Sequence, residues 1–194
     1  MTTKTNRLCQ LGVGLFLSII FIGCGGNPTP KPRGFIRIDF PEKQYKVTSL
    51  PCPYQFEIPA YSGFKKLDRE CDYVLWFPRF KAEVYLNYRP INAENPLQGY
   101  LDEMHKLAYQ HQVKASAINA KTREFSEESK FVLEYEIEGN VASSYQFCVT
   151  DSTSHFLRGA LFFRSRPNQD SLRPATNFIK QDIDHIIKTL EWKP

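Results

Sequence analysis

Cys24 is the residue whose surroundings point most directly to chemistry. It follows a positive start with Lys4 and Arg7, an apolar run over Leu11–Ile22, and the small residue Gly23. This is the layout of a secretory signal, and the apolar run is too short to span a bilayer comfortably. A cysteine at the cleavage position is typical of bacterial lipoprotein signals, in which the thiol is acylated and the cysteine becomes the new N-terminus. The alternative is an ordinary signal or a short membrane anchor with an incidental Cys24.

The segment after Cys24 has the composition of a tether. Gly25 and Gly26 are flexible, and prolines at every second position over 28–32 favour extended polyproline geometry. We therefore predict a lipoprotein signal peptide at 1–23, a lipidated Gly/Pro-rich tether at 24–33 and one globular domain at 34–194. Loss of the signal lowers the net charge from +4 to +2, and without a basic tract no nucleic acid partner is expected.

Three of the five cysteines fall in the globular part: Cys52, Cys71 and Cys148. An exported chain can form disulfides. Cys52 and Cys71 each stand just before a strand-like run, whereas Cys148 lies within one. Residues at the edges of loops pair more readily, so we predict a Cys52–Cys71 disulfide worth about 3 kcal/mol. The alternative is three free thiols.

Side chains of the kinds that hydrolases use occur together only in the stretch TDSTSH. Asp151, Ser152, Ser154 and His155 are neighbours, and a catalytic triad normally assembles from separate segments. The stretch is therefore interpreted as a turn between two strands. The chain has none of the nucleophile-elbow, zinc-protease, P-loop or C-x-x-C motifs, so we expect no enzymatic activity and no cofactor.

Asp182, Asp184 and His185 are the next candidates, for a metal site. Asp182 and His185 share a helix face, but no further ligand type accompanies them. We interpret this face as solvated.

Arginines beside aromatic residues indicate a candidate partner interface over residues 155–173. Arginines and aromatics are the usual anchors of protein interfaces. In a strand, Arg158 and Arg164 would share a face with Phe156 and Phe162. The alternative is pairing with acidic residues of the same chain, and the end of the strand with its following loop would remain available even if the strand is covered. The predicted interface consists of His155, Arg158, Arg164, Arg166 and Arg173.

The elements that must position these residues are mostly strands. Extended segments are expected over 34–60, and a continuous apolar run over 73–77 predicts a strand covered on both faces. Alternation predicts a strand over 83–88. A helix should follow, with Asn95 as its cap and Pro96 in its first turn.

Three strands and a second helix complete the pattern. Residues 131–138 and 144–150 alternate, which predicts one solvated face for each strand, and a further strand is expected around 115–118. Residues 156–163 are apolar on both sides and should lie at the centre of the sheet. Pro174 is predicted to open the second helix, with Trp192 following it. The order predicts an α+β domain with an antiparallel sheet, similar to Mog1/PsbP-like folds.

Several ordered stretches resemble the gliding motility-associated lipoprotein GldD family of the Bacteroidetes. They are "PKPRGFIRIDFPEKQY", "LPCPYQFEIP", "TDSTSHFLRGALFFRSRPNQDSLRP" and "FIKQDIDHIIKTLEW". The resemblance covers the chain from Cys24 onwards. It implies a lipid-anchored envelope protein needed for gliding and for type IX secretion, with no known enzymatic activity. Only Cys24 carries over as a functional residue.

The resemblance also implies a place and partners. Other lipoproteins or envelope components of the gliding and secretion machinery are the expected partners, and the membrane is contacted through the lipid. Gly25 stands where Asp often retains lipoproteins at the inner membrane, and the tether lacks an acidic cluster for surface export. We therefore expect the periplasmic face of the outer membrane. The alternative function is an envelope ligand-binding domain, for example for peptidoglycan, or a hydrolytic domain.

Overall fold

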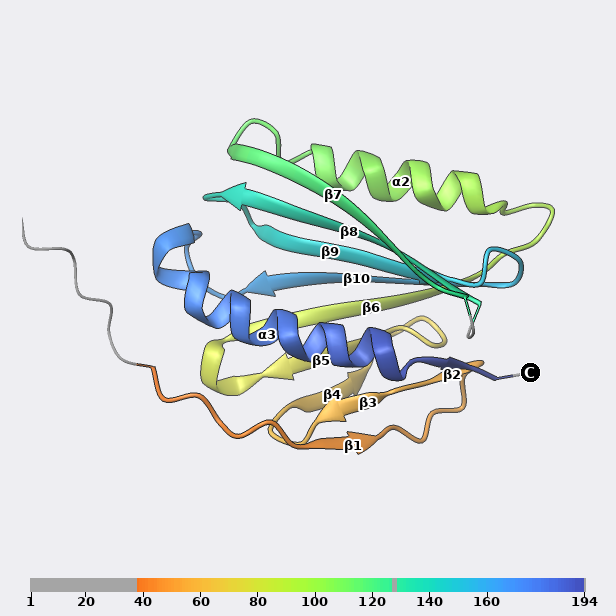
Figure 1. Ribbon diagram of the computed structural model, residues 1–194, viewed down its shortest axis with the longest axis horizontal. Helices are drawn as coiled ribbons and strands as arrows, with labels where there is room; N and C mark the ends of the chain where they lie inside the picture. The colour runs from red at the N-terminus through yellow and green to blue at the C-terminus, as the bar shows by residue number, and fades with distance from the viewer. Residues whose placement is uncertain (1–37, 127–128, 194) are drawn as a thin grey trace, which may run out of the picture. The chain divides into compact units, whose positions relative to one another are not determined.

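The architecture is a seven-stranded sheet with one helix packed on each face (Figure 1). The computed structural model describes residues 38–126 and 129–193, so the predicted signal, the tether and Cys24 lie outside the described residues. The strands are β1 (Tyr45–Val47), β2 (Tyr54–Gln55), β3 (Glu57–Pro59), β4 (Gly63–Lys66), β5 (Tyr73–Phe77), β6 (Ala82–Pro90), β7 (Ala115–Phe125), β8 (Lys130–Gly139), β9 (Ser143–Thr150), β10 (His155–Phe163) and β11 (Glu191–Trp192). The helices are a short 3-10 turn η1 (Pro78–Phe80), α2 (Leu97–Tyr109) and α3 (Gln169–Thr189).

The large sheet is antiparallel throughout and has the order β4-β5-β6-β10-β9-β8-β7. β10 is the fourth of seven strands, which confirms the central position predicted from its apolar residues on both sides. The strand expected around 115–118 is present as the longer β7. The α+β class predicted from the order of elements is therefore confirmed.

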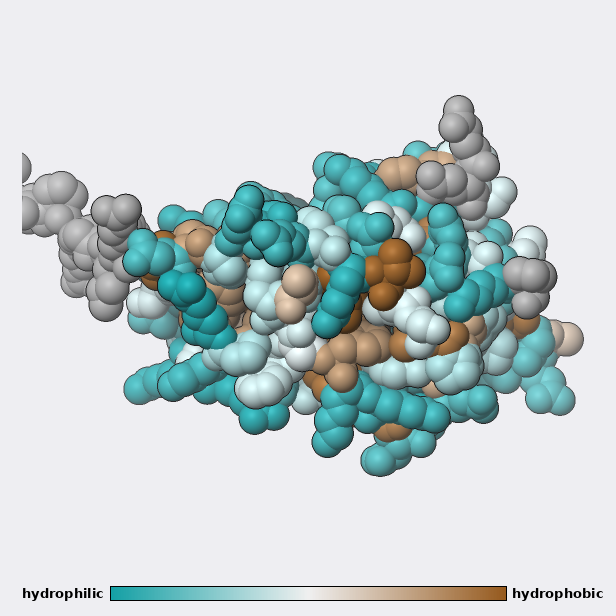
Figure 2. Space-filling view, turned by 90° about the horizontal axis from the view of Figure 1, so that it is seen from below, coloured by the Kyte–Doolittle hydropathy of each residue, from teal (hydrophilic) through white to brown (hydrophobic). Residues whose placement is uncertain are grey.

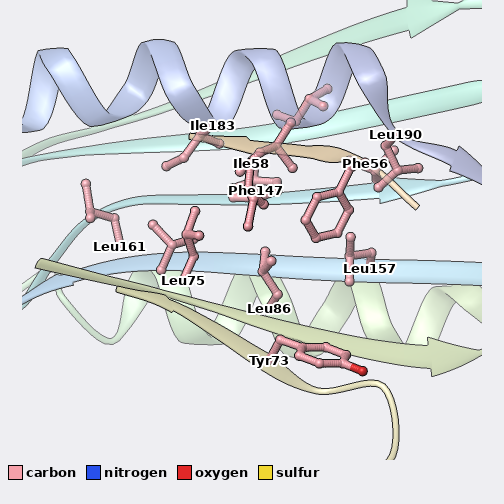
Figure 3. Packing of buried hydrophobic residues seen from close by; sticks show 14 of the residues in the cluster. Phe56, Ile58, Tyr73, Leu75, Leu86, Phe147, Leu157, Leu161, Ile183 and Leu190 are labelled. Carbon is pink, nitrogen blue, oxygen red and sulfur yellow. The ribbon is translucent and has the colours of Figure 1, made fainter. Parts of the chain in front are cut away.

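The main core lies between the sheet and α3 (Figure 3). Leu75, Leu86 and Leu157 project from the sheet towards Ile183 of α3. The ring of Phe147 lies against the backbone of β10, where a Cβ on Gly159 would sit 2.2 Å from two ring carbons. A glycine is therefore required at this close approach.

A second core lies between the other sheet face and α2. Met104 and Ala108 of α2 pack on Tyr135, Cys148 and Phe156 of the sheet. Because successive side chains of a strand point to opposite faces, Phe156 is directed to this core and Leu157 to the α3 core. Burial raises the pKa of the Cys148 thiol to about 12, so this cysteine is a free and protonated core residue.

The solvated faces predicted for β8 and β9 are wrong in part. Val132 and Glu134 of β8 are buried on the α3 side, and Gln146 and Thr150 of β9 are buried on the α2 side. Both strands lie inside the sheet, where a helix covers the face that the alternation assigned to water. The reverse holds in β5, where Trp76 is 45% exposed in a strand expected to be covered on both faces.

Both predicted helix starts require correction. Pro96 stands at the N-cap of α2, where the side chain of Asn95 makes no cap hydrogen bond. α3 begins at Gln169, capped by Asn168, whose side chain accepts a hydrogen bond from the Ser171 backbone N–H at 3.1 Å. Pro174 therefore lies within the helix. The cap satisfies a first-turn donor upstream of the proline, which moves the start by five residues.

Strands β1, β2 and β3, which precede the large sheet in the chain, lie on its α3 side. A disulfide links this part of the chain to the residues just before β5. Cys52 and Cys71 are bonded to each other, as predicted, with their Cα atoms 5.7 Å apart. β1 pairs with β3, and β2 pairs with β11 at the C-terminal end of the chain. Because β11 pairs with β2, Trp192 lies beside β2. Its ring stacks on the ring of His155, with the ring centroids 5.0 Å apart.

Candidate functional site

One half of the α2 face of the sheet is left open by the helix. α2 covers residues of β8, β9 and β10, whereas the β4–β6 half carries the exposed Trp76. The register places Trp76 and Phe162 on either side of Glu83 in one row across this face. A groove of about 650 Å³ lies between this open half and the end of α2. This sheet groove is lined by Glu83, Tyr85, Asn87, Leu107, Gln110, His111, Gln146, Arg158, Ala160, Phe162, Phe163 and Arg164.

The single carboxylate of the sheet groove is already engaged. Glu83 is buried. It accepts a hydrogen bond from the Tyr85 hydroxyl at 3.1 Å and forms an ion pair with Arg164 at 2.5 Å. Burial and the neighbouring Glu83 raise the pKa of Tyr85, which keeps its hydroxyl protonated as a donor. Tyr85 also meets Phe162 edge to face at 5.7 Å. The floor therefore combines a neutralised acid with a fixed aromatic pair.

Arg158 is the other charge of the sheet groove and is poorly compensated. Its side chain is 24% exposed, and its one ion-pair partner in the described chain is Glu103 of α2, at 3.5 Å and 63% exposed. Burial lowers the pKa of Arg158, an effect that Glu103 opposes and the nearby Arg89 reinforces. A loose pair with an exposed carboxylate contributes little. Arg158 therefore remains a half-buried cation with hydrogen-bonding capacity to spare.

The five residues of the predicted interface are not brought together. Arg158 and Arg164 do share one face with Phe162, as predicted, and both line the sheet groove. His155 lies at the far end of β10, where Nδ1 is 2.8 Å from the Tyr88 hydroxyl oxygen. Arg173 pairs with Asp170 one turn away on α3, and the exposed Arg166 lies in the loop before that helix.

The stretch from Asp151 to His155 is a turn, as predicted. One carboxylate oxygen of Asp151 accepts hydrogen bonds from the backbone N–H groups of Thr153, Ser154 and His155 at 2.8–3.0 Å. Burial alone would raise the pKa of Asp151, but these bonds outweigh it and lower the pKa. Asp151 is thus a structural acceptor that shapes the turn.

The solvated face predicted for Asp182 is wrong. Its side chain is fully buried and lies 2.6 Å from Lys43 Nζ, with the hydroxyls of Tyr45 and Tyr61 donating to it at 3.0 Å and 2.7 Å. The segment before β1 thus folds onto α3, where Lys43 also lies 3.4 Å from the ring centroid of Phe178. We call this cluster the arm contact.

The arm contact was missed because its members are distant in sequence. Lys43 and Asp182 are 139 residues apart, and neither has a distinctive neighbour in the sequence. An acid within an otherwise apolar helix stripe was the one available signal.

A polar cavity of about 750 Å³ lies between β7, β8 and α3. Arg123 is at its centre and pairs with Glu134 at 2.9 Å and with Asp184 at 2.6 Å. Glu134 also accepts a hydrogen bond from the Tyr145 hydroxyl. Burial raises the pKa of Asp184, but Lys188 and Arg123 outweigh it and leave the pKa lowered. These acids therefore serve as ion-pair partners.

Two further properties concern only residues 38–126 and 129–193. No group of three or more His, Cys, Asp or Glu side chains is arranged to hold a metal ion there. No helix of this part is long and apolar enough to cross a membrane. Figure 2 views the molecule from the side on which β1 lies in Figure 1, and its apolar atoms form small groups among hydrophilic ones.

The family comparison covers nearly the whole chain. A family model described as gliding motility lipoprotein GldD matches residues 25–192, a range that contains the sheet, both helices and the sheet groove. No curated protein matches the chain. The match includes every element whose geometry is described above. The chain therefore belongs to the GldD family of gliding motility lipoproteins.

Proposed function

We propose that this protein is a non-catalytic component of the gliding and type IX secretion machinery that binds another machinery protein through the sheet groove. Family membership makes it a lipid-anchored envelope protein with a role in gliding motility. The proposed location is the periplasmic face of the outer membrane, with acylation at Cys24, which lies outside the described residues.

The observation that carries the proposal is the composition of the sheet groove. Tyr85, Phe162, Arg158 and Arg164 line a shallow surface on an otherwise well-packed sheet. Buried aromatic and arginine side chains are the residue types that dominate binding energy in protein interfaces. A domain that works by assembly needs such a surface on a rigid support, and the central strands supply it.

The pKa values of two described acids support a binding function over catalysis. Asp151 and Asp184 have displaced pKa values, and both are displaced downward by hydrogen bonds and ion pairs. A general acid working near neutral pH needs a raised carboxyl pKa. The second candidate function, binding or hydrolysis of an envelope ligand such as peptidoglycan, is favoured by the polar cavity around Arg123 and Glu134.

Site-specific photo-crosslinking in native cells tests the proposal. Benzoylphenylalanine at position 162 should capture an envelope protein, identified by mass spectrometry. The same probe at Val47, an exposed residue of β1, is the matched control and should capture markedly less. No crosslink from position 162 would contradict the proposal. Loss of gliding in Glu134→Gln cells, with the fold retained, would favour the second candidate.

A further inference from the structure

We propose that the sheet groove binds an extended acidic segment of its partner protein, and that Arg158 receives one carboxylate of that segment. This inference rests on the proposed function and gives the partner's chemistry. It commits to a polypeptide with at least one Asp or Glu two residues from an apolar side chain.

The charge balance of the sheet groove is the first argument. Arg164 forms an ion pair with Glu83 in the groove wall, and this pair largely compensates its charge. Burial lowers the pKa of His111, which keeps the imidazole neutral at neutral pH. Arg158 is left as the groove cation whose one ion-pair partner among the described residues is the exposed Glu103, since the buried Asp72 nearby is paired with Arg89. A carboxylate is the group whose two oxygens match the guanidinium fork.

Side-chain amides, which can donate hydrogen bonds, also line the groove near Arg158. Gln146 is buried on β9 and lines the same groove as Asn87 on β6. Asn87 stands directly opposite Arg158 across the strand pair, and its amide donates to Asp72 at 3.0 Å. An anionic group entering beside Arg158 would meet side-chain amides; the buried Asp72 is paired with Arg89, and the exposed Glu103 would give up its loose contact with Arg158 to water. Anchoring a carboxylate there needs no displacement of a buried ion pair.

The shape of the groove argues for an extended segment. Its floor follows β10 from Arg158 through Ala160 and Phe162 to Arg164, which lie on one face at alternate positions. The seven residues from Arg158 to Arg164 span about 20 Å, the length of a seven-residue extended peptide. Ala160 leaves space next to the Tyr85–Phe162 pair, where an apolar side chain two residues from the carboxylate would pack. The alternation of the floor thus matches that of an extended ligand.

A single loosely paired guanidinium favours a carboxylate over a phosphate-bearing lipid surface. Phosphate groups on a membrane are usually bound by clusters of basic residues. Among its described residues the sheet groove contains one cation that is only loosely paired, so it lacks the basic cluster by which a membrane surface is usually bound. An anionic lipid surface is therefore the alternative ligand, and the experiment has to distinguish it from an acidic peptide.

The test uses the intact lipoprotein in detergent micelles and two labelled peptides. The probe is acetyl-Phe-Ser-Glu-Ser-Phe-amide, in which Phe and Glu lie on one face of the extended peptide, and its control has Gln in place of Glu. Fluorescence anisotropy should show that the Glu peptide binds about tenfold more tightly than the Gln peptide, because a charge-assisted bidentate contact is lost. Equal affinity of the two peptides would overturn the inference.

Variants assign the effect to Arg158. Arg158→Gln should weaken binding of the Glu peptide about tenfold and leave the Gln peptide unchanged, whereas Arg158→Lys should give an intermediate loss. Arg173→Gln, which removes an exposed arginine outside the groove, should change the affinity less than about twofold. Circular dichroism checks the fold of each variant. Unaltered binding by Arg158→Gln would refute the assignment.

Two outcomes separate this inference from the proposed function. If the crosslink from position 162 persists unchanged in Arg158→Gln cells, the partner-binding function stands and the acidic-segment assignment fails. If vesicles containing phosphatidylglycerol bind in an Arg158-dependent manner while the Glu peptide does not, the occupant is a lipid surface and the inference is wrong. Loss of the crosslink in Arg158→Gln cells but not in Arg173→Gln cells supports it.

Discussion

The two faces of the sheet are covered by helices of different length, and the shorter helix leaves part of its face open. α3 has 21 residues and packs on the main core together with the segments before the sheet. α2 has 13 residues and covers the β8–β10 part of the opposite face. The shorter helix leaves aromatic and arginine side chains of the central strands partly exposed, and this is the surface proposed to bind a partner. Incomplete coverage of a rigid sheet is therefore what creates the candidate site.

The two faces also treat buried charge differently. On the α3 face, Asp182 has three donors from Lys43, Tyr45 and Tyr61. On the α2 face, Arg158 has one ion-pair partner among the described residues, the exposed Glu103 at 3.5 Å. A charge that the domain satisfies internally stabilises the fold, whereas a charge left partly unsatisfied can bind a ligand. The predictions below test this contrast.

Removal of the Asp182 carboxylate should have the largest effect. Asp182→Ala leaves the partly buried Lys43 without its partner and should lower the free energy of unfolding by about 3 kcal/mol, measured by urea denaturation. The double variant Asp182→Leu with Lys43→Met should lose much less, because no unpaired charge remains. A loss under about 1 kcal/mol for Asp182→Ala would show that the arm contact is not a stabilising feature.

A methyl group at position 159 should be the next most damaging change. Gly159→Ala places a Cβ against the Phe147 ring in the α3 core and should cost about 1–3 kcal/mol of unfolding free energy. Gly99→Ala in α2 is the matched control, since nothing lies within 4 Å of its added Cβ. That change should stabilise the protein by up to about 1 kcal/mol. Equal thermal midpoints for the two variants would contradict the difference in packing.

Acid should weaken the α3 face through Asp184. The folded-state pKa of Asp184 is lowered by Lys188 and Arg123, against the opposing effect of burial. The stability that it contributes is therefore present above the unfolded pKa of about 3.9 and is lost as pH falls through the folded value. Asp184→Asn should flatten the decline of unfolding free energy below about pH 4. An unchanged acid limb would assign the decline to other carboxyl groups, such as Asp151.

Substitution on the open half of the α2 face should affect function with little effect on stability. Trp76→Ser changes an exposed side chain and should shift the free energy of unfolding by about 0.5 kcal/mol, followed by circular dichroism. The same cells should spread less on agar if this surface binds a partner. A large loss of stability, or normal spreading at normal protein levels, would remove the contrast between the two faces.

The sequence by itself determined the local features of this protein. Alternation located β6, β8 and β9, and apolar residues on both sides placed β10 at the centre of the sheet. The surroundings of Cys52 and Cys71 were enough to predict their disulfide. These features follow from the period of a strand and from the composition of loop edges, which depend on neighbouring residues.

Tertiary structure decided which faces are wet and which charges are satisfied. Glu134 and Gln146 alternate like solvated residues but are buried because α3 and α2 pack over them. In the sequence Asp182 resembles a surface acid, but in the fold it is paired with Lys43, which lies 139 residues earlier. Arg158 and Arg164 meet in one groove, whereas Arg173 lies elsewhere. Burial and pairing depend on contacts between distant segments, and alternation along a single strand contains no information about what packs on it.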